Sequence, residues 1–188
     1  MDRTEREFAL QHLADSRERL IQIIAGLTSE QHHFRPADDR WSVADCIEHI
    51  TVVERNIFRS LQRVIQTEPQ PEKQAEAQGK DRAILERVPA RANRVTGPPE
   101  VMPCGRWPRF EELLRQFEAS RERTLRFAAV TQADLRNHFF PHPILGLFDG
   151  YQWLLFLATH CERHVRQIEE VMAHPEFPGL PRQEEATV

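Results

Sequence analysis

Hydrophobic residues recur at helical spacing in four long stretches of this chain, and polar residues fill the positions between them. The stretches cover about residues 5–27, 42–67, 109–129 and 150–173. We find no strand pattern and no internal repeat beside them. The hydrophobic pattern therefore predicts an all-α protein built as a four-helix bundle.

Polar residues mark the starts of the second and fourth stretches. Ser42 is a good N-cap, and Asp45 three residues later resembles the acidic partner of a capping box. Asp149 is the expected N-cap of the last helix, and the pair His174-Pro175 ends it. These signals place the beginnings of the two helices that carry the candidate chemistry.

A long proline-rich segment, residues 67–108, separates the second and third helices. Its first part is polar and broken by prolines, and residues 81–88 have the pattern of a short helix. We expect this crossover between helices 2 and 3 to pack along the bundle and to cover one end of it. The whole chain, 1–188, is expected to be one domain with a polar tail over 175–188, in which Phe177 and Leu180 can act as anchors.

Composition and charge narrow the classes of function. The formal net charge of -4 argues against a nucleic-acid surface, which needs a basic stripe. No apolar run is long enough to cross a bilayer, and the charged N-terminus is unlike a signal peptide. Three scattered cysteines do not form a disulfide framework, so a cytoplasmic setting is expected.

Three histidines are the candidate metal ligands. His160 and His164 stand one helical turn apart beside the apolar stripe of the last helix, so both rings point the same way. A third ligand must come from another helix, and His49 on the second helix is the best candidate. A divalent ion such as zinc or nickel suits imidazole ligands. The alternative interpretation is that these are packed core histidines, because two histidines four residues apart also occur by chance.

Three segments of the sequence resemble the DinB/YfiT-like superfamily, and the resemblance covers most of the chain. They are Trp41-Ser42-Val43-Ala44-Asp45-Cys46-Ile47-Glu48-His49, His142-Pro143-Ile144-Leu145-Gly146, and the stretch from Phe156 to Ile168 that contains His160-Cys161-Glu162-Arg163-His164. The resemblance implies a four-helix bundle that holds a divalent metal with one histidine from helix two and two from helix four. Those positions are occupied here by His49, His160 and His164.

The resemblance also implies a range of reactions. Some relatives are thiol-dependent transferases or isomerases, others have been proposed as metal-dependent hydrolases, and many have no known reaction. We therefore expect a metal-dependent enzyme of the S-transferase or hydrolase type that acts on a small molecule, with a low-molecular-weight thiol as a candidate cofactor. The alternative is a non-catalytic metal-binding or stress-response bundle in which a fourth ligand closes the site. The catalytic residues are not identified by the sequence.

Four further residues are candidate neighbours of these three histidines. Glu48 and Glu162 point away from the ligand faces on ideal helices and are expected to be solvated. His142 can line the mouth of the site. Cys46 shares a helix face with His49, where a buried packing residue is the simpler interpretation than a ligand.

Several polar residues interrupt otherwise regular patterns. Arg17 and Arg121 fall on the apolar stripes of the first and third helices. Either their stems pack while their charged groups reach water, or they hold an anionic substrate in an open interior. The adjacent His32 and His33 are expected to be solvated.

Aromatic residues gather near the start of the last helix: Phe139, Phe140, Phe148, Trp153 and Phe156. If exposed, they would form a large apolar patch, which usually marks an interaction site. The sequence therefore predicts a homodimer.

Overall fold

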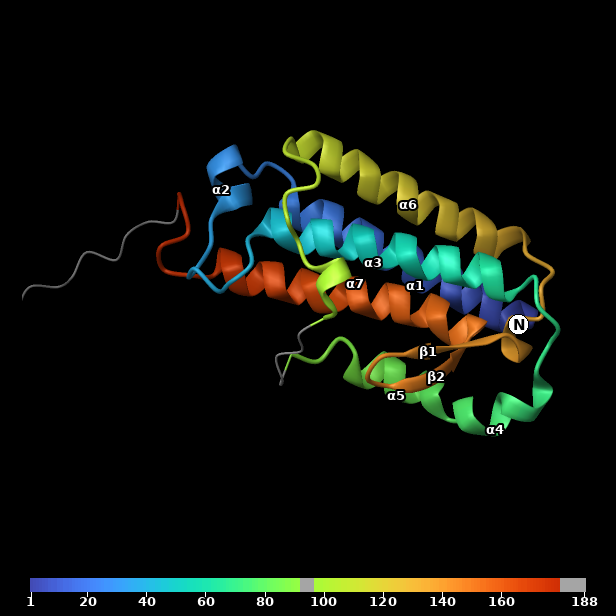
Figure 1. Ribbon diagram of the computed structural model, residues 1–188. Helices are drawn as coiled ribbons and strands as arrows, with labels where there is room; N and C mark the ends of the chain where they lie inside the picture. Colours follow the sequence, from blue (N-terminus) through green and yellow to red (C-terminus); the bar gives the residue numbers. More distant parts are fainter. Residues whose placement is uncertain (92–96, 180–188) are drawn as a thin grey trace, which may run out of the picture.

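Four long helices form the bundle in the computed structural model, which describes residues 1–91 and 97–179 (Figure 1). They are α1 (Arg3–Ile24), α3 (Val43–Val64), α6 (Phe110–Val130) and α7 (Gly150–Met172). Both α1 and α3 contact α6 and α7, so the four helices close around one interior. The predicted all-α four-helix bundle, with a long crossover between its second and third helices, is confirmed.

The predicted capping signals start α3 and α7. The Ser42 hydroxyl accepts a hydrogen bond from the Asp45 backbone N–H at 3.1 Å, and the Asp45 carboxylate accepts one from the Ser42 N–H at 2.8 Å. Asp149 and Gln152 form the same reciprocal pair at the start of α7. These caps satisfy N–H groups that the first turn leaves without partners. They fix where each ligand-bearing helix begins.

The crossover is more ordered than its proline content indicates. It contains α4 (Gln74–Ala77), α5 (Lys80–Arg87) and two short 3₁₀ turns, η1 (Pro71–Lys73) and η2 (Pro99–Val101). The helix expected at 81–88 is α5, which lies one residue earlier and packs against α7. As expected, the described part of the crossover runs along the bundle (Figure 1).

A β-hairpin stands before the last helix, where the sequence shows no strand pattern. Strands β1 (Phe139–His142) and β2 (Gly146–Asp149) are antiparallel, with Phe140 opposite Phe148. Gly146 begins β2 with a φ of 74°, a conformation that favours glycine. Prolines at 141 and 143 hide the strand pattern in the sequence, and a two-stranded hairpin is stable here because it packs against other elements.

The connector before α3 contains a further short helix, α2 (Ser29–His33). The prediction that both of its histidines are solvated is wrong for His32, which is 8% exposed and stacks on Phe110 with ring centroids 3.4 Å apart. Its neighbour His33 is exposed, as expected.

Two apolar clusters fill the bundle, and a polar layer separates them. At its centre is Arg121, whose side chain is fully buried. Its Nε lies 3.0 and 3.1 Å from the two carboxylate oxygens of Glu54, and its Nη1 donates to the Leu13 carbonyl and the Ser16 hydroxyl at 2.7 Å each. Thr124 donates to the same carboxylate at 2.8 Å. All of these partners lie in the interior, so Arg121 is not available to an anionic substrate.

Arg17, the other arginine on an apolar stripe, reaches the surface. Its side chain is 35% exposed and lies 3.6 Å from Glu122. The interpretation that its stem packs while its charged end meets water fits this position.

The aromatic residues near the start of α7 are buried, so the apolar patch proposed from the sequence does not form. Trp153 and Phe156 are 3% and 6% exposed, and Phe139 and Phe148 are also buried. Phe140 stacks on Trp153 with ring centroids 4.4 Å apart. These rings build the interior of one protomer, and the homodimer stays a prediction without this support.

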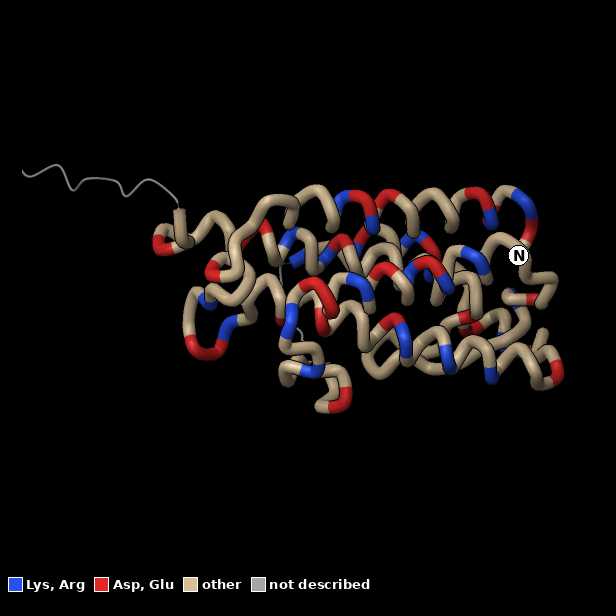
Figure 2. The backbone as a smooth tube through the Cα atoms, turned by 90° about the horizontal axis from the view of Figure 1, so that it is seen from above, with Lys and Arg blue, Asp and Glu red and all other residues tan. Residues whose placement is uncertain are grey.

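The outer faces of the bundle are polar. Acidic and basic residues are interspersed along the helices (Figure 2). Over the described ranges, no helix is long and apolar enough to cross a membrane. Of the two proposed tail anchors, Phe177 is 5% exposed and packs against the core, and Leu180 lies outside the described residues.

Candidate metal centre

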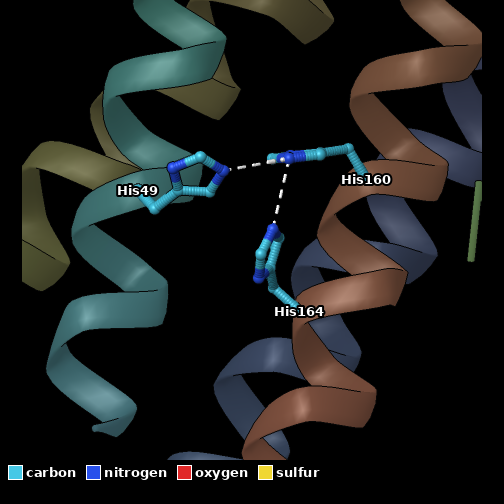
Figure 3. Close-up of side chains that lie close together, drawn as sticks. All are labelled: His49, His160 and His164. Atoms are coloured by element: carbon cyan, nitrogen blue, oxygen red, sulfur yellow. Dashed lines mark hydrogen bonds between the residues drawn. The ribbon is translucent and has the colours of Figure 1, made fainter. Parts of the chain in front are cut away.

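The structure brings together the three histidines that the sequence singled out. His49 projects from α3, and His160 and His164 project from successive turns of α7 (Figure 3). The Nε2 atom of His160 lies 3.2 Å from the Nε2 atoms of both His49 and His164. In the part of the chain that the structure describes, this is the only group of three or more His, Cys, Asp or Glu side chains spaced to hold a metal ion.

These spacings fit a divalent ion. Imidazole nitrogens bind zinc at about 2.0–2.1 Å, which places two tetrahedral ligands roughly 3.3 Å apart. The observed 3.2 Å separations therefore need little rearrangement on binding. His49 and His164 are each 5% exposed, whereas His160 is half-buried on the wall of a cavity. The cluster is thus enclosed on the bundle side and open toward the cavity.

Outer hydrogen bonds hold two of the rings in the tautomer that a metal needs. His49 Nδ1 donates to the Val101 carbonyl at 2.8 Å, and His164 Nδ1 donates to Gln167 Oε1 at 3.0 Å. Gln167 Oε1 also accepts from Arg91 at 3.0 Å, which fixes the orientation of the amide. With the proton on Nδ1, the lone pair of each neutral ring is on Nε2 and points into the cluster.

The electrostatic environment keeps all three rings neutral. Burial lowers the pKa of His49, and burial together with the neighbouring imidazoles lowers the pKa of His160 and His164 well below the usual value. Metal ions bind the unprotonated ring, so a lowered pKa reduces competition by protons. Three neutral rings this close are also compatible with one another, whereas three charged rings would repel.

Glu48 has a role that the sequence did not reveal. The expectation that Glu48 is solvated is wrong, because its residue is only 4% exposed. Its carboxylate accepts hydrogen bonds from three donors: Cys104 N at 2.9 Å, Gly105 N at 3.0 Å and Arg106 Nη1 at 2.6 Å. Burial alone would raise the pKa of Glu48, but these donors outweigh it and the pKa is lowered. Glu48 thereby anchors the segment just after Val101, whose carbonyl orients the adjacent ligand His49.

Cys46 and Glu162 lie away from the cluster. Cys46 is fully buried in an apolar cluster, where burial raises the pKa of its thiol, so it is a packing residue. Glu162 forms an ion pair with Arg19 of α1 at 2.6 Å. Neither side chain belongs to the histidine group. This agrees with the interpretation of Cys46 as a packing residue, whereas Glu162, which was expected to be solvated, is half-buried in its ion pair.

His142 lines the same cavity, from strand β1 of the hairpin. Its Nδ1 accepts hydrogen bonds from the N–H groups of Ile144 and Leu145 at 3.1 Å each, so the proton of the neutral ring is on Nε2. The centroid of the His142 ring lies 4.8 Å from that of Phe156, and the Phe156 ring stacks on the His160 ring with centroids 5.2 Å apart. The ring of Phe156 therefore lies between His142 and the histidine cluster.

Burial of His142 predicts a pH dependence of stability. Burial lowers its pKa to about 4, whereas the unfolded chain has a value near 6.5. Below about pH 6.5 the unfolded chain therefore binds a proton that the folded ring does not, and stability falls as the pH falls toward 4. After a discount for partial exposure, the loss between pH 7 and pH 5 should be about 1 kcal/mol.

The test compares wild type with His142→Asn, whose side-chain oxygen can accept the same backbone hydrogen bonds but does not titrate. Urea unfolding with a chelator present should show a smaller drop in stability from pH 7 to pH 5 for His142→Asn. Equal drops in the two proteins would contradict a neutral, buried His142.

Comparisons with known proteins agree with this fold. The model of the DinB superfamily matches residues 12–168. The uncharacterized protein YuaE of Bacillus subtilis (strain 168) is 22% identical over 149 residues, which cover 79% of this chain and 87% of YuaE. The structure of YfiT from Bacillus subtilis, described as a probable metal-dependent hydrolase with an unusual four-helix bundle topology, matches with a TM-score of 0.64. That match covers 92% of this chain and 88% of YfiT at 14% identity, and it shows a shared fold.

Proposed function

This chain belongs to the DinB superfamily, and on that basis we propose that it is a metal-dependent enzyme acting on a small molecule. The ligands would be Nε2 of His49, His160 and His164, and zinc or nickel is the expected ion. The observation that carries the proposal is the convergence of these three neutral nitrogens, 3.2 Å apart, on the wall of a cavity.

The number of ligands favours catalysis over a purely structural metal. Structural zinc sites are closed by four protein ligands, whereas catalytic sites keep three and leave one position open. Among the residues that the structure describes, no fourth His, Cys, Asp or Glu joins the group. The alternative, a non-catalytic metal-binding or stress-response bundle, requires such a fourth ligand.

The chain would supply the ligands of the ion and the groups that orient them. A divalent ion held by the neutral rings of His49, His160 and His164 would keep its full charge and would supply Lewis-acid chemistry toward a carbonyl or a partner for a thiolate. The Val101 carbonyl and Gln167 orient the ligands, and the aromatic side chains of Trp153 and Phe156 wall off the cavity from the bundle interior. His142 offers an Nε2–H donor from the hairpin side.

Two reaction types suit this arrangement. One is hydrolysis of a small ester or amide, which is consistent with the description of YfiT as a probable metal-dependent hydrolase. The other is transfer of a low-molecular-weight thiol to an electrophile, which the resemblance to the superfamily raised. We propose that the enzyme belongs to the hydrolase or the S-transferase class. Among the described residues there is no evident general base, which would have favoured hydrolysis.

A paired screen tests the enzyme proposal. Chelator-treated and metal-reconstituted protein should be incubated with small esters, small amides, and thiol–electrophile pairs. Turnover should rise at least about 100-fold with metal, because an ion at the reacting group lowers the barrier by several kcal/mol. Identical behaviour of the two forms over a broad screen would eliminate the enzyme and leave the structural-metal alternative.

The assembly and location stay proposals. A homodimer, small-molecule partners in place of nucleic acid, and a cytoplasmic setting are all still expected from the sequence. Light scattering over a wide concentration range distinguishes a dimer from a 22.0 kDa monomer.

A further inference from the structure

The cavity beside the histidine cluster is large enough for a whole small molecule. Its volume is about 750 Å³, and its lining combines all three cluster histidines with residues of α5, the hairpin and α7. Along α7, Trp153 and His160 are seven residues apart, or roughly 10 Å. Both line the cavity, so a ligand whose reacting group is at the histidines can extend over this length.

One wall of this space is apolar and aromatic. Phe148, Trp153 and Phe156 line it, and their rings pack on one another with centroids 5.2 to 6.2 Å apart. Apolar side chains continue to the hairpin turn, where Ile144 and Leu145 line the cavity although they are 61% and 40% exposed. Exposed apolar residues beside an apolar cavity indicate that the molecule it binds has an apolar body.

The charged groups of the lining are strongly biased to one sign. The described lining has five Lys or Arg residues and one acid, although the whole chain has a net charge of -4. The acid, Glu170, is already paired with one of the five, Arg91, through contacts of 2.6 and 2.8 Å. A concentration of one charge in a cavity of low dielectric attracts a ligand of the opposite sign.

Two of these cations stand on the cavity face of α5. Lys80 and Arg87 are two turns apart, with Ile84 between them on the same face. Lys80 donates to the carbonyls of Leu145 and Leu147 at 3.3 and 2.8 Å, and these neutral acceptors do not cancel its charge. Arg87 is exposed, and within the described residues no acid pairs with it. This α5 wall is therefore a cationic part of a cavity whose other lining is largely apolar.

We propose that the substrate bound by this cavity is an amphipathic acid: an apolar body of roughly 10 Å that lies on the aromatic wall, with an anionic group held by the cationic wall of α5. This inference rests on the proposed function, because it names the substrate class of the same site. The anionic group, a carboxylate or a similar small acid, is attracted by the positive charges of Lys80 and Arg87, which line the cavity.

The test uses three probes of equal length and different charge: octanoate, octanamide and octylamine. Calorimetry on both chelator-treated and zinc-loaded protein should show octanoate binding at least about tenfold more tightly than octylamine, with octanamide between them. Chelator-treated protein is essential, because a carboxylate can also bind the zinc ion itself.

Charge reversal at α5 isolates the cationic wall. Arg87→Glu should weaken octanoate binding about tenfold and leave octanamide within about twofold. Arg59→Glu is the matched control, because Arg59 is exposed on α3 outside the cavity lining and changes the net charge equally. It should leave all three affinities unchanged.

Equal affinities for octanoate and octylamine in wild type would overturn the proposal. So would an equal loss of octanoate and octanamide binding in Arg87→Glu, since that would indicate a distorted cavity. The binding test of the substrate class and the turnover test of the proposed function can fail independently. Metal-dependent turnover without a preference for octanoate would reject only the substrate class, and Arg87-dependent octanoate binding without turnover would reject only the enzyme.

Discussion

Protein in which His160 is replaced by alanine should be purified without its divalent ion, whereas wild type should contain close to one ion per chain. His160 is the central member of the cluster, because its Nε2 is 3.2 Å from both other ligand nitrogens. Loss of an outer-shell partner alone costs about 10–100-fold in metal affinity, so loss of this ligand should cost more. Elemental analysis and a competition titration with a coloured zinc chelator measure both quantities.

The fold of the His160→Ala protein should be intact. His160 is half-buried on the cavity wall, and the buried apolar residues of α7 are unchanged by the substitution. Circular dichroism should therefore show the helix content of wild type. His33→Ala, at an exposed position outside the cluster, is the matched control and should keep its metal. Equal metal content in wild type and His160→Ala would rule out the site.

Replacing Arg121 by methionine should have the largest effect on stability. The substitution removes the buried partner of Glu54 and leaves a carboxylate charge in the interior. It also deprives the Leu13 carbonyl and the Ser16 hydroxyl of a donor. Breaking a buried ion pair from one side costs about 3–5 kcal/mol, and urea unfolding at neutral pH should show a loss of this size.

A double variant separates the cost of an unpaired charge from the value of the pair. In Arg121→Met with Glu54→Leu, apolar side chains replace both charges, and similar replacements elsewhere are often neutral or stabilising. The double variant should therefore be at least about 2 kcal/mol more stable than Arg121→Met alone. A single variant with the stability of wild type would show that Arg121 is not the centre of the polar layer.

The local elements of this fold could be predicted from the sequence. Helical periodicity identified all four long helices, and the capping residues Ser42 and Asp149 placed the starts of α3 and α7. The i, i+4 spacing of His160 and His164 is enough to put both rings on one side of α7. Each of these features depends only on neighbours within a few residues, which is why sequence is sufficient.

Features that depend on contacts between distant residues were harder to predict from the sequence. The hairpin β1–β2 was not predicted, because its two prolines obscure the strand pattern and its pairing depends on packing against α7. The sequence of α6 is compatible with either a structural or a binding role for Arg121, because the choice depends on where Glu54 and Ser16 lie in the bundle. His32 was predicted to be solvated because Phe110, the ring that covers it, is far away in the sequence.

By itself, the sequence determined the fold class and the pairing of His160 with His164 on successive turns of one helix, because hydrophobic periodicity and side-chain spacing are local properties. Only the tertiary structure decided that His49 reaches that pair, since this depends on the relative height of α3 and α7 in the bundle. It also decided that Glu48 anchors the segment after Val101 and that α5 faces the cavity with its cations. These contacts join residues that are far apart in the sequence, and the packing of the whole chain fixes their distances.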